Sequence, residues 1–280
     1  MSAFYLFLCA AVIGAVEGVT EWLPISSTGH MLLLDAWLKM KDGVSESFYS
    51  FFLVAVQLGA ILAVAVLYFK RLNPWSMGAS PADRRKVFRL WRCVLVGILP
   101  AALLGILLDD FLEERLYGAP VIAAMLLLYG VLFIVIERKK KNALARVESV
   151  YEISYRDALM TGCFQALSLI PGTSRSGSTI LGGMLLGVSR TASSEFSFFM
   201  ATPVMAGASL LRGAKLIASG AKVTKTELCV LLIGISVAFA VSLVTIRFLM
   251  SFVKRHSFEA FGWYRILLGI LVLTLSMASR

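Results

Sequence analysis

Long apolar blocks alternate with short polar segments along the chain, and within each block the apolar residues are continuous. Blocks of about 17 to 22 residues have the length of a helix that spans a bilayer, whereas a membrane β-barrel would show alternating strands of about ten residues. The pattern therefore predicts an all-α polytopic membrane protein. Its six transmembrane helices are expected at about 48–69, 93–108, 120–136, 196–218, 228–248 and 262–279.

Two further apolar segments, 3–38 and 157–188, are each interrupted by a polar island, EGVTEWLPISSTGH at 17–30 and PGTSRSGST at 171–179. Half-length apolar runs on both sides of a Pro, Gly and Ser break predict two re-entrant helical hairpins, which enter the membrane and leave it by the same face. A charged side chain at membrane depth costs roughly 2.5 to 3.5 kcal/mol, so the islands need a functional reason. We expect them to meet and form one site.

The two halves of the chain resemble each other, which indicates a duplication. Matching segments recur in the same order: GAVE at 14–17 and GCFQ at 162–165, PISSTG at 24–29 and PGTSRSG at 171–177, YSFF at 49–52 and FSFF at 196–199, VGI at 96–98 and IGI at 233–235. Each half is then one hairpin followed by three spans, and an odd number of crossings turns the second copy upside down. The prediction is an inverted-topology repeat within a single membrane domain, 1–280, with repeat one at about 1–137 and repeat two at about 157–280.

Composition supports the membrane assignment. With 59% hydrophobic residues, 16% charged residues and a mean hydropathy of +0.83, the chain has more apolar surface than a soluble domain of this size buries. The N-terminal segment lacks a basic region and a small-residue cleavage site, so we expect no removable signal peptide. Four cysteines in apolar segments, without CxxC spacing or a His partner, are interpreted as small buried apolar residues: Cys9, Cys93, Cys163 and Cys229.

The net charge of +10 raises the possibility of a nucleic-acid partner, but the positions of the basic residues argue against one. They concentrate in the predicted loops 70–92 and 137–156, beside spans, which is the positive-inside pattern, with attraction to anionic lipids as a second effect. An acidic loop at 109–117 lies between them in sequence and is expected outside. The first hairpin and both termini are then outside as well. Lys254 and Arg255 agree with this orientation, while Lys215, Lys222 and Lys225 do not.

Glu17 and Glu21 are four residues apart, so on a helix they project from one face about one turn apart. Two such carboxylates can share a divalent cation, Mg²⁺ or Ca²⁺, or divide the roles of base and metal ligand. The alternative is that they only solvate an aqueous mouth, and an ExxxE pattern by itself is a weak signal.

The sequence PISSTGH at 24–30 ends one helical arm and opens the next, where free backbone N–H groups and the helix dipole favour an anion. Ser26, Ser27 and Thr28 add hydroxyls, and at least one of them is expected to cap the helix. His30 can transfer a proton near neutral pH. Otherwise it is a hydrogen-bonded packing residue.

In PGTSRSGST at 171–179, glycines and hydroxyls surround one guanidinium, that of Arg175. Arginine can bind phosphate oxygens bidentately in a dry site. The alternative is a structural salt bridge to Glu17, Glu21 or Glu195. Arg190 and Glu195 are interpreted as a structural pair or cap at the membrane interface.

These motifs, ExxxE at 17–21, PISSTGH, PGTSRSGST and EFSFFMATP at 195–203, resemble the undecaprenyl-diphosphate phosphatase family of the bacitracin-resistance type. The resemblance covers essentially the whole chain in order. It implies an integral enzyme of the bacterial inner membrane that hydrolyses undecaprenyl diphosphate to undecaprenyl phosphate and phosphate, which recycles the lipid carrier for peptidoglycan. It also implies the inverted-repeat fold and an active site that opens to the periplasm. The family's functional residues are all present: Glu17, Glu21, Ser27, His30, Ser174, Arg175, Ser176 and Thr179.

The resulting prediction assigns three groups of residues. The catalytic residues are Glu17, Glu21, Ser27, His30 and Arg175; the substrate-binding residues are Ser26, Thr28, Gly172, Ser174, Ser176 and Thr179; the metal ligands are Glu17 and Glu21. Ser27 with His30 or Glu21 as base is the preferred nucleophile, ahead of a metal-activated water and of His30 itself. The partners are the polyprenyl diphosphate and membrane lipids, with no nucleic acid.

Two questions stay open from the sequence. A secondary transporter or lipid flippase could use the same inverted repeat with broken helices, and a structural scaffold would leave the buried polar residues unexplained. Gly14 and Gly18 form a small-xxx-small pair that could pack helices within one chain or in a homodimer.

Overall fold

The computed structural model describes residues 1–280 except 77, 79, 141–142, 222 and 279–280, and it describes the side chains of the remaining residues except those of 36 and 109–114. The described residues form helices and one isolated β-bridge, Val147 to Val188, with no strand. The helices are α1 (Ala3–Thr20), α2 (Ser27–Leu38), α3 (Glu46–Ala55), α4 (Gln57–Leu67), α5 (Phe69–Leu72), α6 (Pro81–Leu116), α7 (Ala119–Lys140), α8 (Tyr155–Ala166), α9 (Arg175–Leu185), α10 (Arg190–Ala218), α11 (Lys225–Val253) and α12 (Glu259–Ala278). Short 3₁₀ turns lie at Met40–Gly43, Val150–Glu152 and Leu167–Leu169. The all-helical prediction is confirmed.

Six helical stretches of the described residues are long and apolar enough to cross a membrane, as predicted, but one member of the set differs. They are Ala3–Thr20, Glu46–Leu67, Pro81–Leu108, Ala119–Lys140, Lys225–Val253 and Glu259–Met277. The prediction named 196–218 as a span and assigned 3–20 to a hairpin. α10 covers the former region with 29 residues but carries Glu195, Arg212, Lys215 and several hydroxyls, which lower its hydropathy, whereas α1 is apolar up to Glu17.

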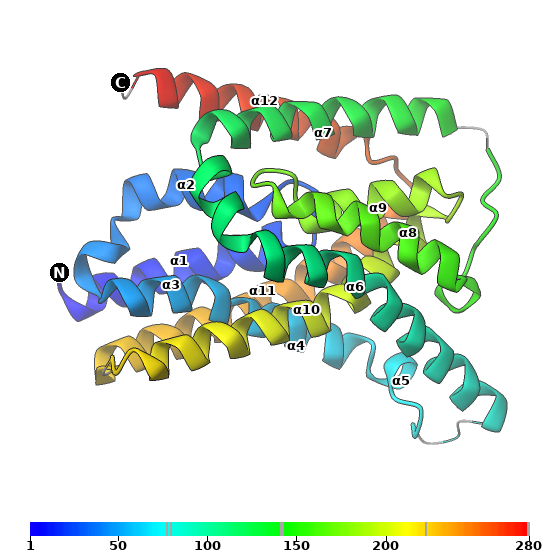
Figure 1. Cartoon of the computed structure of the whole chain (residues 1–280), viewed down its shortest axis with the longest axis horizontal. Coiled ribbons are helices and arrows are strands. Elements are labelled where there is room, and N and C mark those ends of the chain that lie inside the picture. Colours follow the sequence, from blue (N-terminus) through cyan, green and yellow to red (C-terminus); the bar gives the residue numbers. More distant parts are fainter. Residues whose placement is uncertain (77, 79, 141–142, 222, 279–280) are drawn as a thin grey trace.

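Helix α6 corrects the prediction of a loop at 109–117, because it continues to Leu116. It also begins earlier than the predicted span: Ser80 is the N-cap in a reciprocal capping box with Asp83, and Pro81 occupies the first turn, where its missing N–H is tolerated. Much of the basic segment 70–92 is therefore helical. Pro100 lies inside α6, and the helix is visibly bent (Figure 1).

The two segments that carry the polar islands fold back on themselves in the same way. Tyr5 at the start of α1 donates a hydrogen bond to the carbonyl of Leu38 at the end of α2 over 3.1 Å. Arg146 similarly joins Asp157 at the start of α8, 2.5 Å away, to the carbonyl of Leu186 after α9. The turn of each pair lies near the middle of the molecule, and the two pairs come from opposite ends (Figure 1).

Glycines bring each of these pairs onto a helix of the other half of the chain. A Cβ at Gly14 of α1 would lie 2.5 Å from the carbonyl oxygen of Gly234 in α11, and a Cβ at Gly162 of α8 would lie 2.1 Å from that of Gly97 in α6. Both contacts require glycine because no side chain fits. Gly18 likewise faces Ala238 of α11, so the Gly14 and Gly18 pair packs helices within one chain.

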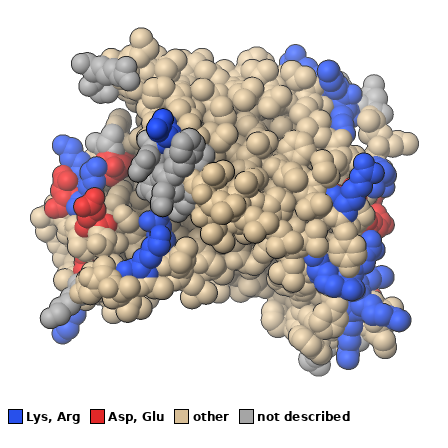
Figure 2. Space-filling model, in the orientation of Figure 1, with Lys and Arg blue, Asp and Glu red and all other residues tan. Residues whose placement is uncertain are grey.

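The surface has an apolar band between two charged rims (Figure 2). Large apolar side chains are exposed along the outer helices, for example Leu103, Ile106 and Leu107 of α6, as expected for lipid contact. The prediction of four buried cysteines is wrong for Cys163 and Cys229, which are exposed, and right for Cys9 and Cys93. Burial is not required of an apolar side chain when the surrounding medium is itself apolar.

Lysine and arginine gather on the rim where α6 begins and α7 ends, whereas the opposite rim, which holds both termini, mixes the two signs (Figures 1 and 2). The protein is thus a multi-pass membrane protein with one predominantly positive end.

Candidate functional site

The helices α2 and α9 begin with matching, strained turns. Ser26 and Ser174 are their N-caps, with φ of 73° and 71°, and their hydroxyls accept hydrogen bonds from the backbone N–H groups of Gly29 (3.4 Å) and Gly177 (3.1 Å). Positive φ is uncommon for a residue with a side chain and costs of order 1 kcal/mol or more, so the surrounding structure must hold both serines in this conformation. The expected capping role is confirmed for Ser26. At each site the following residue, Ser27 or Arg175, is the first of its helix.

The two polar islands meet, as the sequence predicted. Arg175 donates from Nη2 to Glu21 Oε1 over 2.8 Å, and this ion pair is almost buried, with 13% of the arginine side chain exposed. A second contact runs from the Ser176 hydroxyl to the carbonyl of Leu23, 3.3 Å away. The structure therefore places the acidic and the cationic motif in one site.

The Arg175 guanidinium is held by a third element, α10. Its Nη1 donates to the carbonyl and the hydroxyl of Ser197 over 2.6 and 3.0 Å, and Thr179 bonds the same hydroxyl over 2.7 Å. The guanidinium also lies over the ring of Trp22, 5.8 Å from its centroid. Its Nε is buried without a partner among the described residues. Ser197 was not predicted, although it belongs to the EFSFFMATP motif.

Glu17 and Glu21 are both buried and lie one helical turn apart, and Glu21 contacts this guanidinium. Oε1 of Glu17 has no partner in the described part of the chain. One guanidinium for two adjacent carboxylates leaves a negative charge that a proton or a cation would neutralise.

The donor set suits a cation shared with a substrate better than a closed protein cage. No group of three or more His, Cys, Asp or Glu side chains with metal-binding geometry occurs among the described residues. Mg²⁺, however, is usually held by one or two carboxylates together with substrate phosphates and water. The unpartnered oxygen of Glu17 beside Glu21 fits this kind of site.

Ser27 and His30 do not contact each other in the way a serine–histidine pair would. The Ser27 hydroxyl is directed at Glu21 Oε2, 3.4 Å away. His30 is bound on both sides, by the carbonyl of Ser26 at Nδ1 and by the hydroxyl of Tyr264 at Nε2, each over 2.7 Å. Because a carbonyl only accepts, Nδ1 carries the proton and, in a neutral ring, Nε2 accepts from Tyr264.

Arg265 of α12 is a site residue that the sequence reasoning missed. It is 0% exposed, and it donates to Pro24 O over 3.2 Å, to Gly172 O over 2.9 Å and to Thr173 O over 3.0 Å. A longer bond reaches Met125 O. No acidic side chain of the described residues forms an ion pair with it. Arg265 therefore ties the turns of both islands together through their backbones. In the sequence, the sign of its importance was the position of a charged residue inside an apolar span.

Comparison with known proteins decides the family. The family described as Bacitracin resistance protein BacA matches residues 10–271. The chain belongs to this family. Among curated proteins it is 51% identical to an undecaprenyl-diphosphatase of Enterococcus faecalis over 98% of both chains. It is 49% identical to one of Lactiplantibacillus plantarum over 94% of this chain and 95% of the relative, and 48% identical to one of Acetivibrio thermocellus over 97% and 98%. The resemblance stated from the motifs is confirmed.

The remaining predicted site residues of this BacA-family chain lie in or next to the two turns. The hydroxyls of Ser174 and Ser176 are 3.2 Å apart, and each also bonds the backbone, at Gly177 N–H and Leu23 O respectively. Gly172 has φ of 91°, and a Cβ there would lie 2.6 Å from Ile122 O, which gives it a packing requirement of its own. Thr28 is half-buried on the first turn of α2.

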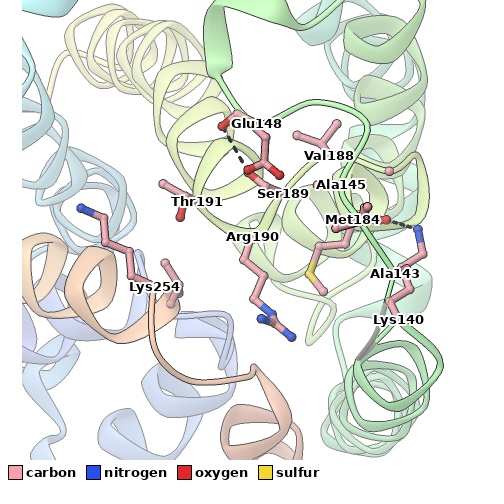
Figure 3. A pocket seen from close by; sticks show the side chains of 13 residues that line it. Lys140, Ala143, Ala145, Glu148, Met184, Val188, Ser189, Arg190, Thr191 and Lys254 are labelled. Carbon is pink, nitrogen blue, oxygen red and sulfur yellow. Dashed lines mark hydrogen bonds between the residues drawn. The ribbon is translucent and has the colours of Figure 1, made fainter.

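Arg190 and Glu195 pair with other residues and not with each other. Arg190 binds Glu137, and Glu195 binds Arg71. Arg190 also lines a cavity of about 370 Å³ at the positive end of the molecule, together with Lys140 and Lys254 (Figure 3). Lys140 there bonds the carbonyls that end α9. The cavity contains no residue of either island, so it is separate from the candidate active site.

Proposed function

We propose that the two islands form the active site of an integral-membrane phosphatase, which hydrolyses undecaprenyl diphosphate to undecaprenyl phosphate and inorganic phosphate and so recycles the lipid carrier for cell-wall synthesis. The observation that carries this proposal is the contact between Arg175 and Glu21, which brings a guanidinium, two carboxylates and two helix N-termini to one buried place. This set of groups suits a diphosphate. The lipid part of the proposed substrate is taken from the name of the relatives, undecaprenyl-diphosphatase.

The diphosphate binds between the first turns of α2 and α9. Arg175 gives up Glu21 and clamps the phosphate oxygens, and the backbone N–H groups at both helix starts donate to the same anion. The hydroxyls of the two turns supply further donors: Ser26, Thr28, Ser174, Ser176 and Thr179, with Gly172 allowing the close approach of the backbone. Electrostatic stabilisation of this kind carries most of phosphoryl-transfer catalysis.

Ser27 is the nucleophile and Glu21 its base, because the Ser27 hydroxyl is directed at Glu21 whereas both nitrogens of His30 are engaged elsewhere. Oγ attacks the terminal phosphorus, and its proton passes to Glu21. The bond from that phosphorus to the bridging oxygen breaks, and undecaprenyl phosphate leaves. Water then cleaves the phosphoserine, releases inorganic phosphate and restores the hydroxyl. The second choice of nucleophile is a metal-activated water that attacks the phosphorus directly. The third choice is His30.

Glu17 and Glu21 would hold a divalent cation, Mg²⁺ or Ca²⁺, together with the substrate oxygens. The cation would supply neutralising charge and orient the diphosphate. Its fit rests on the unpartnered Oε1 of Glu17 next to the second carboxylate.

The site lies within an inverted-topology repeat whose two re-entrant hairpins are α1 with α2 and α8 with α9. Two matched features support this arrangement: the strained caps Ser26 and Ser174, and the glycine contacts of Gly14 with Gly234 and of Gly162 with Gly97. The protein resides in the bacterial inner membrane. The positive-inside rule supports an orientation with the positive rim in the cytoplasm. An active site that opens to the periplasm is what the family resemblance implies.

The test is phosphate release from undecaprenyl diphosphate by the purified protein in detergent, where no transport is possible. An enzyme releases phosphate with multiple turnovers, whereas a lipid flippase on the same repeat releases none. A phosphoserine trapped on Ser27 during a burst would establish the covalent route, and full activity of Ser27→Ala would exclude it.

A further inference from the structure

A cleft of about 260 Å³ lies directly beside the site, between α1 and α12. Its lining comes from four parts of the chain: α1 (Ala15, Val16, Val19 and Thr20), the turn that follows it (Ile25), α2 (His30) and α12 (Tyr264). His30 is one helical turn from Ser27, a rise of about 5 Å. The cleft therefore begins within about one turn of the proposed nucleophile.

The walls of the cleft are suited to hydrocarbon and not to an anion. Four of its seven lining residues are aliphatic, and the Thr20 hydroxyl is bonded to the carbonyl of Val16. The polar atoms of His30 and Tyr264 bind each other, and their rings are parallel within 6°, with centroids 5.7 Å apart. These two side chains thus present to the cleft a flat surface whose polar atoms are bonded to each other.

The cleft opens on the side of the molecule. Val19 is 36% exposed and Tyr264 is 43% exposed, and each lies in a helix that is long and apolar enough to span a membrane, α1 and α12. Because both helices are candidate membrane spans, we expect this flank to contact acyl chains. A ligand that extends from the site through the cleft would pass from a polar centre into lipid.

We propose that this cleft holds the first isoprene units of the substrate's polyprenyl chain, and this rests on the proposed function. With the diphosphate between Ser27 and Arg175, the lipid-linked phosphate is on the His30 side. The chain then runs between Val16 and Val19 on one wall and Tyr264 on the other into the bilayer. The protein then recognises a prenyl chain by its first units only, because the remaining units lie in lipid and do not contact the cleft.

The experiment fills the cleft with a larger side chain and measures KM for the lipid substrate separately from Ki for a head-group analogue. Val16→Trp and Val19→Trp are compared with Val244→Trp, which makes the same change at an exposed position of α11 away from the cleft. Each variant is assayed for phosphate release from undecaprenyl diphosphate, and for inhibition by methylenediphosphonate, a head-group analogue without a prenyl chain. The cleft variants should raise KM for the lipid about tenfold, which corresponds to about two methylene groups no longer buried. The Ki of the analogue and kcat should stay within about twofold.

Two results would overturn the proposal: cleft variants that match Val244→Trp in KM, or an equal rise in KM and Ki, which would place the effect at the head group. A second measurement does not depend on turnover. A photoreactive farnesyl diphosphate analogue should label residues 15–25 or Tyr264 in the parent protein, and labelling elsewhere counts against the cleft. If the parent binds and labels there but releases no phosphate, the proposed function fails while the tail site stands.

Discussion

Arg265→Gln is the substitution that tests most directly how the two islands are held together. In the parent, one buried guanidinium donates to Pro24, Gly172 and Thr173 over 2.9 to 3.2 Å. A hydrogen bond from a charged group contributes about 1.5 to 3 kcal/mol, so three of them amount to roughly 5 to 9 kcal/mol. Removal of the unpaired guanidinium also relieves a desolvation penalty of several kcal/mol. The expected net loss of stability is about 2 to 4 kcal/mol.

The same change should affect catalysis more than binding. Without the tie, the turn that carries Ser27 can shift relative to the turn that carries Arg175, and a shift of about 1 Å can reduce a rate about 100-fold. We expect kcat to fall about 100-fold with KM for undecaprenyl diphosphate changed less than about threefold, measured by phosphate release at a temperature well below the unfolding midpoint. Arg265→Lys keeps the charge but loses the planar fork, so it should recover only part of the rate.

The matched control is Arg89→Gln. Arg89 also donates to two carbonyls, those of Tyr151 and Ile153, but over 3.4 Å each and from an exposed position at the positive end. The Arg89→Gln variant should have the kcat of the parent and an unfolding midpoint close to that of the parent. If Arg265→Gln unfolds early yet retains the parent kcat, Arg265 is structural only, and the reasoning that it positions the two islands is refuted.

Three further predictions follow from the site and the packing. Arg175→Ala should reduce kcat by about 100- to 1,000-fold without loss of the fold; residual turnover near the parent level with a lowered unfolding midpoint would make the arginine structural. Chelation should abolish phosphate release and added Mg²⁺ or Ca²⁺ restore it, with Glu17→Gln needing about tenfold more metal for half-maximal rate; activity that is indifferent to chelator would exclude the cation. Gly162→Leu should destabilise the protein by about 3 kcal/mol in a detergent melt, because its Cβ would lie 2.1 Å from Gly97 O, while Gly207→Leu, with open space around it, should not.

Much of the site could be predicted because its residues are anomalous in their surroundings. Glu21 and Arg175 are charged groups in apolar segments, and such groups are retained only where they have partners. Their pairing across the chain, at 2.8 Å, follows from this requirement. The cap predicted for the first island also followed from local chemistry, since serine is a preferred N-cap. The positive φ of Ser26 and Ser174 could not be predicted, because it depends on how the turns are held from outside.

What the sequence did not reveal depends on tertiary contacts. Arg265 stands in an apolar span and resembles the other arginines near span ends, and only the structure brings it against the backbones of both islands. The acidic segment at 109–117 was misread as a loop because charge alone was used to end a helix, whereas α6 continues to Leu116. The partnership of His30 with Tyr264 joins residues far apart in the chain and had no local signature.

In the proposed inverted repeat, the two strained turns allow one duplicated element to give a site with two different halves. Each turn fixes a serine cap and presents the next residue as the first of a helix, Ser27 in one copy and Arg175 in the other. The backbone requirement is the same at both places, so the cap and the glycine three residues later are retained while the presented residue is free to differ. In the proposed mechanism, a nucleophile and a cation would then reach one anion from two helix N-termini. The contact between Glu21 and Arg175 has to cross from one copy to the other, and it follows that neither hairpin alone should hydrolyse the lipid.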